Sequence, residues 1–494
     1  MRVSDCVSAL RDVLVSSSDF SDFEIVSVVN NASAAVPGCL FCAIRGAKFN
    51  GHDFLAGAVM NGAVFLVVHE SCPDEKIPQR VPFVKVADSY AAWGRLCALA
   101  EGRPADHLRV HGVTGTNGKT STAILLHHFL TCAAKRRCGL LTTVFTDVCG
   151  GGREESSNTM PDAAALQKLF RRLADNGAQD VVMECSSHGL SQSRSGDVRY
   201  ASAVFTNLTG DHLDYHGTMD AYFQAKKRLF TDFAGPGMPA VIHVDDPYGK
   251  RLYDELEHVP VKRVGVSFED PDSECFVKNY RLFDARTEIE LVLFGKTLNF
   301  TTHLTGRHNI CNTVCAMAAA AAQGCDPDAL ALAAESAPAA PGRLEGFLLK
   351  SGAHAFVDYA HTDDALLRVE AALNALKKPG GRLITVFGCG GDRDRTKRPR
   401  MGKVVAEQSD MMIVTSDNPR TEDPLFIIGE IEKGIPAGTE YSVEPDRAKA
   451  IALAASLAKS GDLLLIAGKG HETYQEINGV RHHFDDREEI SKFI

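Results

Sequence analysis

A loop with the residues of a phosphate-binding site lies near residue 115. It spans residues 114–120, TGTNGKT, and it follows an apolar run, Val110–Val113, that is typical of a buried parallel strand. Glycines let backbone N–H groups approach phosphates closely, and the start of a helix favours their negative charge. Lys119 would contact the β- and γ-phosphates, and the Thr120 hydroxyl would bind Mg²⁺. The loop therefore predicts binding of a nucleoside triphosphate. The alternative is a glycine turn before an ordinary helix, because Val113 stands where the common spacing has a glycine.

The elements around this loop predict two mostly parallel sheets. Strands and helices alternate from about 105 to 335 and again from about 347 to the end. Ligands bind at the carboxyl ends of such strands, so the polar residues that follow them are candidates for ligand binding. Single strands are expected at 139–146, 180–185, 203–207 and 240–244, and later at 355–358, 382–387, 411–415 and 463–467.

The composition is that of a water-soluble, intracellular protein. The net charge of −10 argues against nucleic-acid binding, and the longest apolar run, 316–322, is too short to cross a membrane. Fourteen cysteines without a regular framework indicate reduced thiols, and the Cys39–Cys42 pair is interpreted as core packing rather than a zinc site. The first residues lack the apolar stretch of a signal peptide, so a cytoplasmic location is predicted.

Two linker-like segments predict three domains in the 494 residues. A glycine–arginine–proline segment lies near 101–104, and two prolines and a glycine lie within 335–346. The predicted domains are 1–103, 104–337 and 338–494. The fold class is α/β, with a small N-terminal α/β domain, a central P-loop domain with a mostly parallel sheet and a C-terminal Rossmann-like domain.

Ten motifs, in order along nearly the whole chain, resemble those of the Mur ligases, most closely of the MurE type. They are TGTNGKT (114–120), MECSSHGL (183–190), NLTGDHLDYHG (207–217), AKKRLF (225–230), LTGRHNICN (304–312), PGRLE (341–345), DYAHTDDAL (358–366), GCGGDRD (388–394), DNPRTEDP (417–424) and GKGHE (468–472). Ten motifs in register are far more specific than any one of them.

The resemblance implies an ATP-dependent ligase of peptidoglycan precursor synthesis, and so a role in cell-wall biogenesis, cell shape and cell division. The substrate would be UDP-N-acetylmuramoyl-L-alanyl-D-glutamate. Its D-glutamate carboxylate would take the γ-phosphoryl group of ATP, and an amine would then displace phosphate from the acyl phosphate. Magnesium ions and lysines would neutralise the charge of the reacting anions. A monomer is expected, without nucleic-acid or membrane partners.

The resemblance also assigns roles to individual residues. The catalytic residues would be Lys119, Glu184, His212 and Lys226, and the Mg²⁺ ligands would be Thr120, Glu184, His212 and Lys226, the last modified to a carbamate by CO₂. The ATP-binding residues would be Gly115, Thr116, Asn117, Gly118, Lys119, Thr120, Ser121, Asn309, Arg343, Asp358 and His361. The UDP-substrate would contact Ala32, Asn158, Thr159, Met160, Ser186, Gln192 and Arg194. Two departures from the family are Met160, where a second threonine is usual, and the segment Asn31-Ala32-Ser33, where the family has Asp-Ser-Arg.

The motif DNPR predicts which amino acid is added. In the family it accompanies meso-diaminopimelate, which differs from lysine by a second carboxylate that the Arg420 guanidinium could bind bidentately. The predicted amino-acid-binding residues are Arg393, Asp417, Asn418, Pro419, Arg420, Gly468 and Glu472. The alternative is that Arg420 only pairs within its own loop.

Other functions remain open on sequence alone. A folylpolyglutamate synthase or a lysine-adding enzyme of the same superfamily would share the phosphate loop, but DNPR and a full-length first domain argue against both. A P-loop ATPase acting as a switch or motor would not need Lys226 or the C-terminal motifs.

Overall fold

The computed structural model describes residues 1–46, 49–156, 158–283 and 286–494. Its mixed α/β architecture confirms the predicted fold class. The chain forms two compact units. The first comprises 1–278, 291–298 and 311–333, and the second comprises 279–290, 299–310 and 334–494. The predicted boundaries near 103 and 337 stay predictions.

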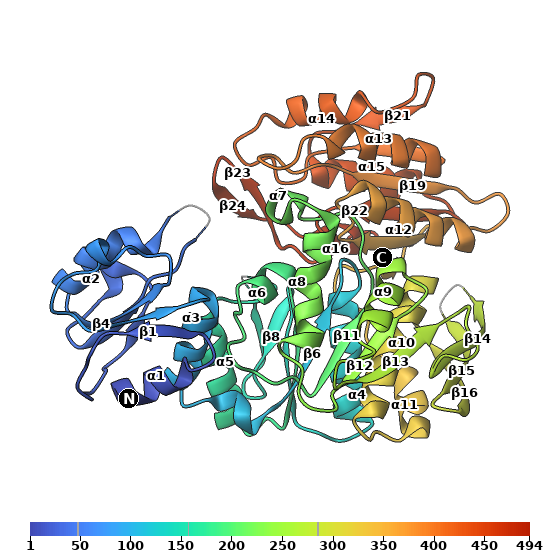
Figure 1. Ribbon diagram of the computed structural model, residues 1–494. Coiled ribbons are helices and arrows are strands. Elements are labelled where there is room, and N and C mark those ends of the chain that lie inside the picture. Colours follow the sequence, from blue (N-terminus) through green and yellow to red (C-terminus); the bar gives the residue numbers. More distant parts are fainter. Residues whose placement is uncertain (47–48, 157, 284–285) are drawn as a thin grey trace. The chain divides into compact units, whose positions relative to one another are not determined.

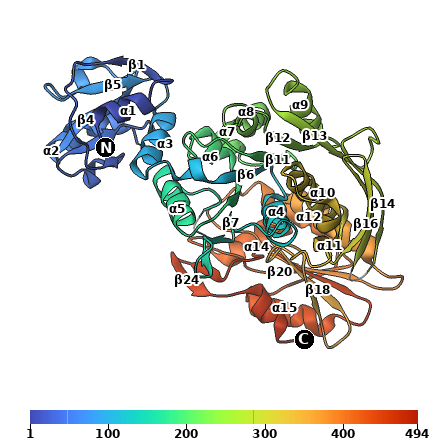
Figure 2. The same cartoon turned by 90° about the horizontal axis from the view of Figure 1, so that it is seen from below.

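A five-stranded sheet forms the N-terminal part of the first unit, in the order β1-β5-β4-β3-β2. The elements are α1 (Val3–Ala9), β1 (Leu14–Ser17), β2 (Val28–Val29), η1 (Ala32–Ala34), β3 (Cys39–Cys42), η2 (Gly51–Phe54), α2 (Leu55–Met60), β4 (Ala63–His69), η3 (Asp74–Lys76), β5 (Phe83–Val86) and α3 (Ser89–Ala100). Helices cover both faces, with α1 and α3 in one core and α2 in the other (Figure 2). Cys39 and Cys42 belong to these two cores as buried free thiols, as predicted.

An eleven-stranded sheet carries the phosphate loop, in the order β16-β15-β14-β13-β12-β11-β6-β10-β7-β8-β9. Its strands are β6 (Arg109–Thr114), β7 (Cys138–Leu141), β8 (Phe145–Asp147), β9 (Arg153–Glu155), β10 (Asp180–Glu184), β11 (Ser202–Phe205), β12 (Pro239–His243), β13 (Lys262–Ser267), β14 (Cys275–Leu282), β15 (Thr287–Leu293) and β16 (Lys296–Thr302). The strands from β7 through β10, β6, β11 and β12 to β13 are parallel, which brings their carboxyl ends to one edge.

The helices that connect these strands lie on both faces of the sheet. They are η4 (Pro104–His107), α4 (Lys119–Cys132), α5 (Ala163–Asp175), α6 (Ser187–Ser191), α7 (Leu213–His216), α8 (Met219–Thr231), α9 (Pro247–Glu255), α10 (Arg307–Ala322) and α11 (Pro327–Ala334). One core joins α5, α8 and α9 to the sheet through Phe170, Phe230 and Leu252.

The single strand predicted at 139–146 is wrong. The structure has two antiparallel strands there, β7 and β8, with a turn between them. The Thr142 hydroxyl accepts the backbone N–H groups of Val144 and Phe145 and so stabilises this turn. The sequence conceals this break because threonine, which stands at 142 and 143, is also common inside strands. The strands β13–β16 were also not predicted, and β15 shows the alternating burial of a strand with one covered face.

A six-stranded sheet in the order β17-β18-β22-β19-β20-β21 forms most of the second unit (Figure 1). Its elements are β17 (Glu345–Leu348), β18 (His354–Asp358), α12 (Asp363–Leu376), β19 (Leu383–Phe387), α13 (Lys397–Gln408), β20 (Met411–Val414), α14 (Pro424–Glu432), β21 (Tyr441–Val443), α15 (Arg447–Leu457), β22 (Leu463–Ala467), β23 (Tyr474–Ile477), β24 (Val480–His483) and α16 (Asp486–Ser491). Only β17 is antiparallel within this sheet. Helices α12–α14 cover one face, and α15 and α16 the other.

The order of these strands creates a switch point at β22. The chain passes from β18 to β19 over α12, and β22 later inserts between them. Ligands of open α/β sheets bind beside such points at the carboxyl ends of the strands. Among the described residues, no helix is both long and apolar enough to cross a bilayer.

A buried carboxyl, Glu370 on α12, makes the stability of the protein depend on pH. Thr385 and Ser409 hydroxyls donate to its Oε1 over 2.9 Å each, and Oε2 has no hydrogen-bond partner in the described chain. Burial raises the pKa of Glu370 to about 7. Because the pKa of Glu370 is higher in the folded than in the unfolded protein, its contribution to stability is complete below the unfolded-state pKa. That contribution is lost as pH rises through 7.

We therefore expect the free energy of unfolding of the wild type, relative to Glu370→Gln, to fall by about 3 kcal/mol between pH 4.5 and pH 8. Urea unfolding at the two pH values measures this difference. Glu407→Gln, at a solvent-exposed carboxyl 3.8 Å from Lys403, is the matched control and should show no such change. An equal pH dependence in the wild type and Glu370→Gln would contradict the assignment.

Candidate functional site

The phosphate loop is shaped by two glycines that no other residue could replace without strain. Gly115 and Gly118 have φ of +149° and +83°, and Gly118 caps the N-terminus of α4. A Cβ on Gly115 would overlap the Thr206 hydroxyl, and a Cβ on Gly118 would overlap the Asn312 side-chain oxygen. The backbone conformation and the close approach both require glycine here.

The segment after β11 fixes the phosphate loop by hydrogen bonds. Asn207 Oδ1 accepts the Asn117 N–H at 3.0 Å, and Asn207 Nδ2 donates to the Asn117 carbonyl at 3.0 Å. The Thr206 hydroxyl donates to the same carbonyl at 2.6 Å. Thr116 exchanges hydrogen bonds with the Thr209 backbone at 3.0 and 3.2 Å. The motif at 207–217 thus holds the loop in place, and the loop N–H groups lie at the start of a helix, where anions bind.

Two lysines converge on the Gly115 carbonyl. Lys119 Nζ donates to it at 3.1 Å and to the Thr116 carbonyl at 2.8 Å. Lys226, which α8 places from the opposite side, donates to the Gly115 carbonyl at 2.7 Å. Burial lowers the pKa of Lys226 well below its usual value, and the charge of Lys119 lowers it further. Among the described residues Lys226 forms no ion pair, and its Nζ lies 4.6 Å from the centre of the Tyr222 ring.

Glu184, at the end of β10, is held by Thr143 on the neighbouring turn. The Thr143 N–H donates to Oε1 at 2.9 Å and its hydroxyl donates to Oε2 at 3.1 Å or to Thr159 at 3.0 Å. The Glu184 side chain is fully buried. Hydroxyl and carboxylate oxygens such as those of Thr120 and Glu184 suit Mg²⁺. No cluster of three or more His, Cys, Asp or Glu fit to hold a metal occurs in the described parts of the chain.

His212 lies in a group of aromatic rings beside the phosphate loop. It has φ of +53°, its ring centre is 4.9 Å from that of His188, and its Nε2 is 3.5 Å from Asp211. Tyr222, which lies 6.2 Å from His212, shares a hydrogen bond of 3.2 Å with Thr116. The structure therefore brings His212 to the loop side of the sheet.

Most of the residues predicted to bind the UDP-substrate form one connected group. Arg194 donates to Gln192 Oε1 at 2.9 and 3.0 Å and to the Met160 carbonyl at 2.6 Å. Thr159 joins the group to Glu184 through Thr143. Ser186 acts locally, since its hydroxyl accepts the Gly189 N–H at the start of α6. Asn158 is exposed, whereas the unusual Met160 is buried against Gly189.

Ala32 lies apart from this group, on the short helix η1 that precedes β3 of the five-stranded sheet. Its carbonyl accepts a hydrogen bond of 2.9 Å from Asn61, and the Asn31 side chain caps the same turn. Ala47 and Lys48 lie outside the described residues. Ser121 is buried in the first turn of α4.

The ATP-binding residues predicted in the second unit lie around the end of β18. Asp358 accepts the N–H groups of Leu344 and Ala360 at 2.7 and 2.8 Å, and burial raises its pKa. The Arg343 guanidinium lies 4.8 Å from the centre of the Tyr359 ring. His361 is bonded through Nδ1 to the Tyr359 carbonyl. Asn309, which donates to the Thr305 carbonyl at 2.9 Å, lies at the start of α10.

The predicted amino-acid site contains a buried polar cluster at the switch point. Asn418 donates to Glu472 Oε2 at 2.7 Å and accepts the Glu476 N–H at 2.9 Å. Lys469 donates to both Asn418 and Glu472, at 3.2 and 3.1 Å. Asp417 lies close to Gly468, because a Cβ added to Gly468 would be 2.7 Å from Asp417 Oδ2. The side chains from the turns after β20 and β22 thus meet.

Two arginines flank Gly390 in the turn after β19. A Cβ on Gly390 would lie 3.0 Å from Arg420 Nη1 and 3.8 Å from Arg393 Cγ. Arg420 has φ of +52°, donates to the Gly391 carbonyl at 2.8 Å and lies 3.7 Å from Glu476. The Arg420 guanidinium and the Arg393 side chain thus lie beside the same glycine, and a guanidinium can bind a carboxylate bidentately.

A fully buried arginine, Arg398 on α13, fixes both arginine-bearing loops. It binds Glu422 through two bonds of 2.7 and 2.9 Å, Glu430 at 2.7 Å and the Gly390 carbonyl at 3.1 Å. Glu422 also accepts the Asp392 N–H. Arg398 and Thr143 were not identified from the sequence, because each acts through another residue and neither belongs to one of the motifs. Asn312 ends the motif at 304–312, but its contact with the phosphate loop was not predicted.

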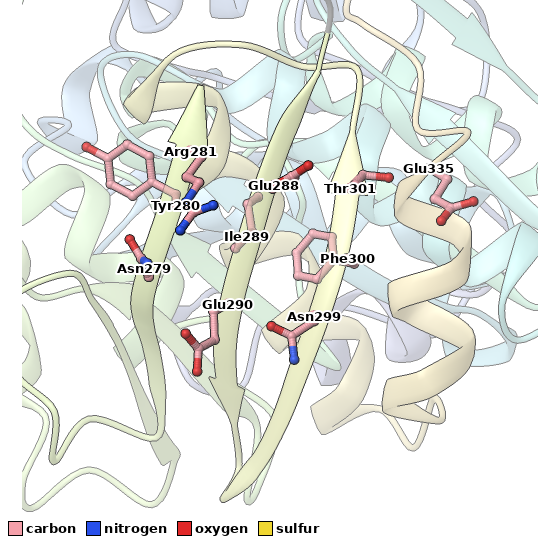
Figure 3. Close-up of a pocket in the computed structure, with 10 residues that line it drawn as sticks. All are labelled: Asn279, Tyr280, Arg281, Glu288, Ile289, Glu290, Asn299, Phe300, Thr301 and Glu335. Carbon is pink, nitrogen blue, oxygen red and sulfur yellow. The ribbon is translucent and has the colours of Figure 1, made fainter. Parts of the chain in front are cut away.

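A separate polar hollow of about 430 Å³ lies on β14–β16 and contains none of the predicted site residues. Figure 3 shows its lining on three strands, with Glu335 following α11. Its described lining includes three glutamates (Glu288, Glu290 and Glu335) and one arginine, Arg281. Among the described residues the lining is therefore more acidic than basic.

Comparison with known proteins extends the resemblance. Residues 113–320 match the Mur ligase middle domain, and residues 342–470 match the Mur ligase, glutamate ligase domain. The UDP-N-acetylmuramoyl-L-alanyl-D-glutamate--2,6-diaminopimelate ligase of Geobacter metallireducens is 42% identical, over 92% of this chain and 91% of that protein. The enzyme of that name from Gloeobacter violaceus is 40% identical, over 96% and 94%.

Comparison with solved structures gives the same family. A structure of a UDP-N-acetylmuramoyl-L-alanyl-D-glutamate--2,6-diaminopimelate ligase has a TM-score of 0.68 at 32% identity and covers 95% of this chain and 94% of that chain. The folylpolyglutamate synthase of Mycobacterium tuberculosis has a TM-score of 0.64 at 21% identity, over 77% of this chain and 93% of that one. The second likeness shows a shared fold alone.

Gly115→Ala tests the geometry of the phosphate loop. Strain and overlap with Thr206 should weaken ADP binding about tenfold or more, because backbone strain of this kind costs on the order of 1–3 kcal/mol. Calorimetric titration with ADP measures the change. Gly102→Ala is the control, since Gly102 has φ of +72° but open space around it. Unchanged ADP affinity in Gly115→Ala would mean that this loop does not hold the phosphates.

Proposed function

The chain belongs to the Mur ligase family, and we propose that it joins 2,6-diaminopimelate to UDP-N-acetylmuramoyl-L-alanyl-D-glutamate with consumption of ATP. The reaction belongs to the synthesis of peptidoglycan precursors. The observation that supports the choice of amino acid is the Arg420 guanidinium beside Gly390, with the Arg393 side chain near the same glycine. The use of ATP supports the cytoplasmic location predicted above.

The reaction has two steps. A carboxylate oxygen of D-glutamate attacks the γ-phosphorus of ATP, the bond to the bridging oxygen of ADP breaks, and an acyl phosphate forms. The amine of diaminopimelate then attacks the acyl carbon, phosphate leaves, and the nitrogen loses its surplus proton. The first step brings two anions together, so its barrier falls where cations neutralise the developing charge.

The phosphate loop and its lysine supply that neutralisation. The loop N–H groups bind the phosphates, and Lys119 leaves the Gly115 and Thr116 carbonyls for the γ-phosphate when ATP binds. Thr120 and Glu184 would hold Mg²⁺, with His212 near a second ion. When bound, Mg²⁺ screens the phosphate charge and polarises the phosphoryl oxygens.

Lys226 has the chemistry that carbamate formation needs. A neutral amine attacks CO₂, whereas an ammonium cannot, and burial beside Lys119 favours the neutral form of Lys226. The carbamate would place an anion beside the loop, where it could accept a hydrogen bond or bind a cation. We propose that Lys226 acts in this form.

The amino-acid site fits a molecule with two ammonium and two carboxylate groups. Arg420 and Arg393 would bind the carboxylate that lysine lacks, and Glu472 would accept an ammonium. A guanidinium left without that carboxylate penalises lysine, since sites built for a polar group reject analogues without it by roughly 10⁴-fold.

The decisive experiment measures phosphate release with UDP-N-acetylmuramoyl-L-alanyl-D-glutamate, ATP and Mg²⁺, with either meso-diaminopimelate or L-lysine. We expect turnover with diaminopimelate and at least about 1,000-fold lower kcat/KM with lysine. Comparable turnover with lysine would leave the ligase in place and refute the role of the arginines. ATP hydrolysis that is independent of any amino acid would instead favour a P-loop ATPase.

Arg420→Ala should lower kcat/KM for diaminopimelate about 100-fold, because a bidentate guanidinium–carboxylate pair is lost. The activity with lysine should change much less. Arg400→Ala is the matched control, since Arg400 is an exposed arginine of the same unit that pairs with Asp363 at 3.0 Å. Equal losses with both amino acids would show that Arg420 only maintains its loop.

Lys226→Ala should reduce the rate of phosphate release about 100-fold or more while the protein stays folded. Lys227→Ala is the control, because Lys227 is the next residue on α8 and forms a surface pair with Glu255. To test the carbamate itself, activity of the wild type is measured after removal of CO₂ and after addition of bicarbonate. Full activity without CO₂ would contradict the carbamate.

A further inference from the structure

A fully buried ion pair next to the predicted amino-acid site has no role in the reaction above. Arg447 is the first residue of α15, and Asp486 is the first residue of α16. Neither side chain has exposed surface. Arg447 Nε donates to Asp486 Oδ1 and Nη2 donates to Oδ2, each over 2.7 Å. Two parallel bonds of this kind fix the orientation of the guanidinium plane.

The same guanidinium holds the backbone at the ends of two strands. Nη2 donates to the Ala467 carbonyl at 3.0 Å, and Nη1 donates to the Ser416 carbonyl over a longer 3.4 Å. Ala467 is the last residue of β22, and Ser416 follows the end of β20 by two positions. In the order of the described strands β19 lies between β20 and β22, so ladder hydrogen bonds do not join their ends directly. Arg447 therefore bridges two segments that are not neighbours in the sheet.

The two carbonyls stand directly before the turns that are predicted to bind the amino acid. Asp417 follows Ser416, and Gly468 follows Ala467. The first residues of the two turns are closely packed. A Cβ added to Gly468 would lie 2.7 Å from Asp417 Oδ2 and 3.7 Å from Arg447 Nη2. A shift of either carbonyl would therefore change the spacing of Asp417 and Gly468.

The charges around Arg447 keep it in this position. Burial acts to lower the pKa of Arg447, but the Asp486 carboxylate raises it above its usual value, and Asp417 and Glu472 raise it further. The pair with Asp486 uses the donor on Nε and one donor on Nη2, which leaves donors on Nη1 and Nη2 for the two carbonyls. The ion pair thus orients the guanidinium toward the backbone of both turns.

The helix that supplies Asp486 is itself attached to the sheet. Ile490 of α16 belongs to the same buried core as Ile451 of α15. The Phe493 carbonyl, just after α16, accepts the Lys350 N–H at 2.9 Å. All of these residues belong to the second unit. Contacts through Arg447 therefore link α16 to the turn at 417–420, although the two are distant in the sequence.

We propose that Arg447, held by Asp486, is a positioning residue that sets the spacing of the two turns for the amino acid. This role rests on the ligase function proposed above, and it adds α15 and α16 to the elements that build the amino-acid site. Arg447 acts through the backbone before Asp417 and Gly468 rather than as a ligand of the amino acid. Misplacement of binding groups by about 1 Å, caused by a change far from the chemistry, can cost on the order of 100-fold.

The test compares Arg447→Lys with the wild type in steady-state phosphate release. Lysine keeps the charge but lacks the planar fork that binds a carboxylate and two carbonyls at once. We expect KM for diaminopimelate to rise about 30-fold, while KM for ATP and for UDP-N-acetylmuramoyl-L-alanyl-D-glutamate changes less than about twofold. A merely structural role would lower kcat with the folded fraction and leave every KM unchanged. An unchanged KM for diaminopimelate would overturn the proposal.

Arg382→Lys is the matched control, because Arg382 forms a similar pair at the opposite ends of the strands. Its Nε and Nη2 donate to Asp462 at 3.2 and 2.6 Å, and Nη2 also donates to the Leu457 carbonyl at 2.8 Å. Arg382 directly precedes β19, and Asp462 directly precedes β22. We expect this variant to unfold at lower urea concentration with no change in any KM. An equal rise of KM for diaminopimelate here would refute a specific role of Arg447.

Asp486→Asn keeps the shape of the buried pair and tests the proposal even if Arg447→Lys does not fold. It should raise KM for diaminopimelate about tenfold, and the double variant should show less than the product of the single effects, because both act through one contact. Fully multiplicative effects would count against that shared contact. Absence of wild-type turnover with any amino acid would refute the ligase and this role with it, whereas wild-type turnover with unchanged KM in the variants would refute the positioning role alone.

Discussion

The convergence of two lysine amines on one backbone carbonyl governs the chemistry of the phosphate site. Lys119 and Lys226 both donate to the Gly115 oxygen, one from the loop and one from α8. Two ammonium groups at such a distance repel each other, and burial of one of them raises the cost of its charge. The arrangement becomes favourable when Lys226 is neutral or when negative charge enters. A triphosphate and a carbamate each supply that charge, so the same repulsion prepares the site for its substrate and Lys226 for its modification.

The sequence predicted the parts of this site that follow from local pattern. Glycines before a Lys-Thr pair required a particular backbone, and both positive φ angles are found where a phosphate loop needs them. The parallel strands ending at Glu184 and at 205 followed from short apolar runs, and their common edge followed from the parallel order. The two-strand break at Thr142 could not be predicted, because threonine is also common inside strands and only the folded structure shows that this hydroxyl closes a turn.

Contacts between residues far apart in the sequence could not be predicted from such local patterns. Thr143 holds Glu184 from another strand end, and Asn312 fills the space above Gly118 from a helix almost 200 residues later. In the sequence, Arg398 is one of several cations within the basic stretch 393–400. In the structure it is fully buried and donates to Glu422, Glu430 and the Gly390 carbonyl. Only the packing of α13 against α14 reveals that this cation organises the loops around Gly390 rather than facing solvent.

The conformation of Arg420 explains why the amino-acid site should discriminate by charge. Its φ of +52° is unfavourable for a side chain with a Cβ, and it is maintained by backbone hydrogen bonds to Glu476 and from Asn478. The strain aims the guanidinium at Gly390 and away from a close ion pair, since Glu476 stays 3.7 Å away. A charge-assisted bond would be about 2.7–2.9 Å long. The guanidinium is thus held, at a cost to the fold, with part of its binding capacity unused, and a ligand carboxylate is the group that would use it.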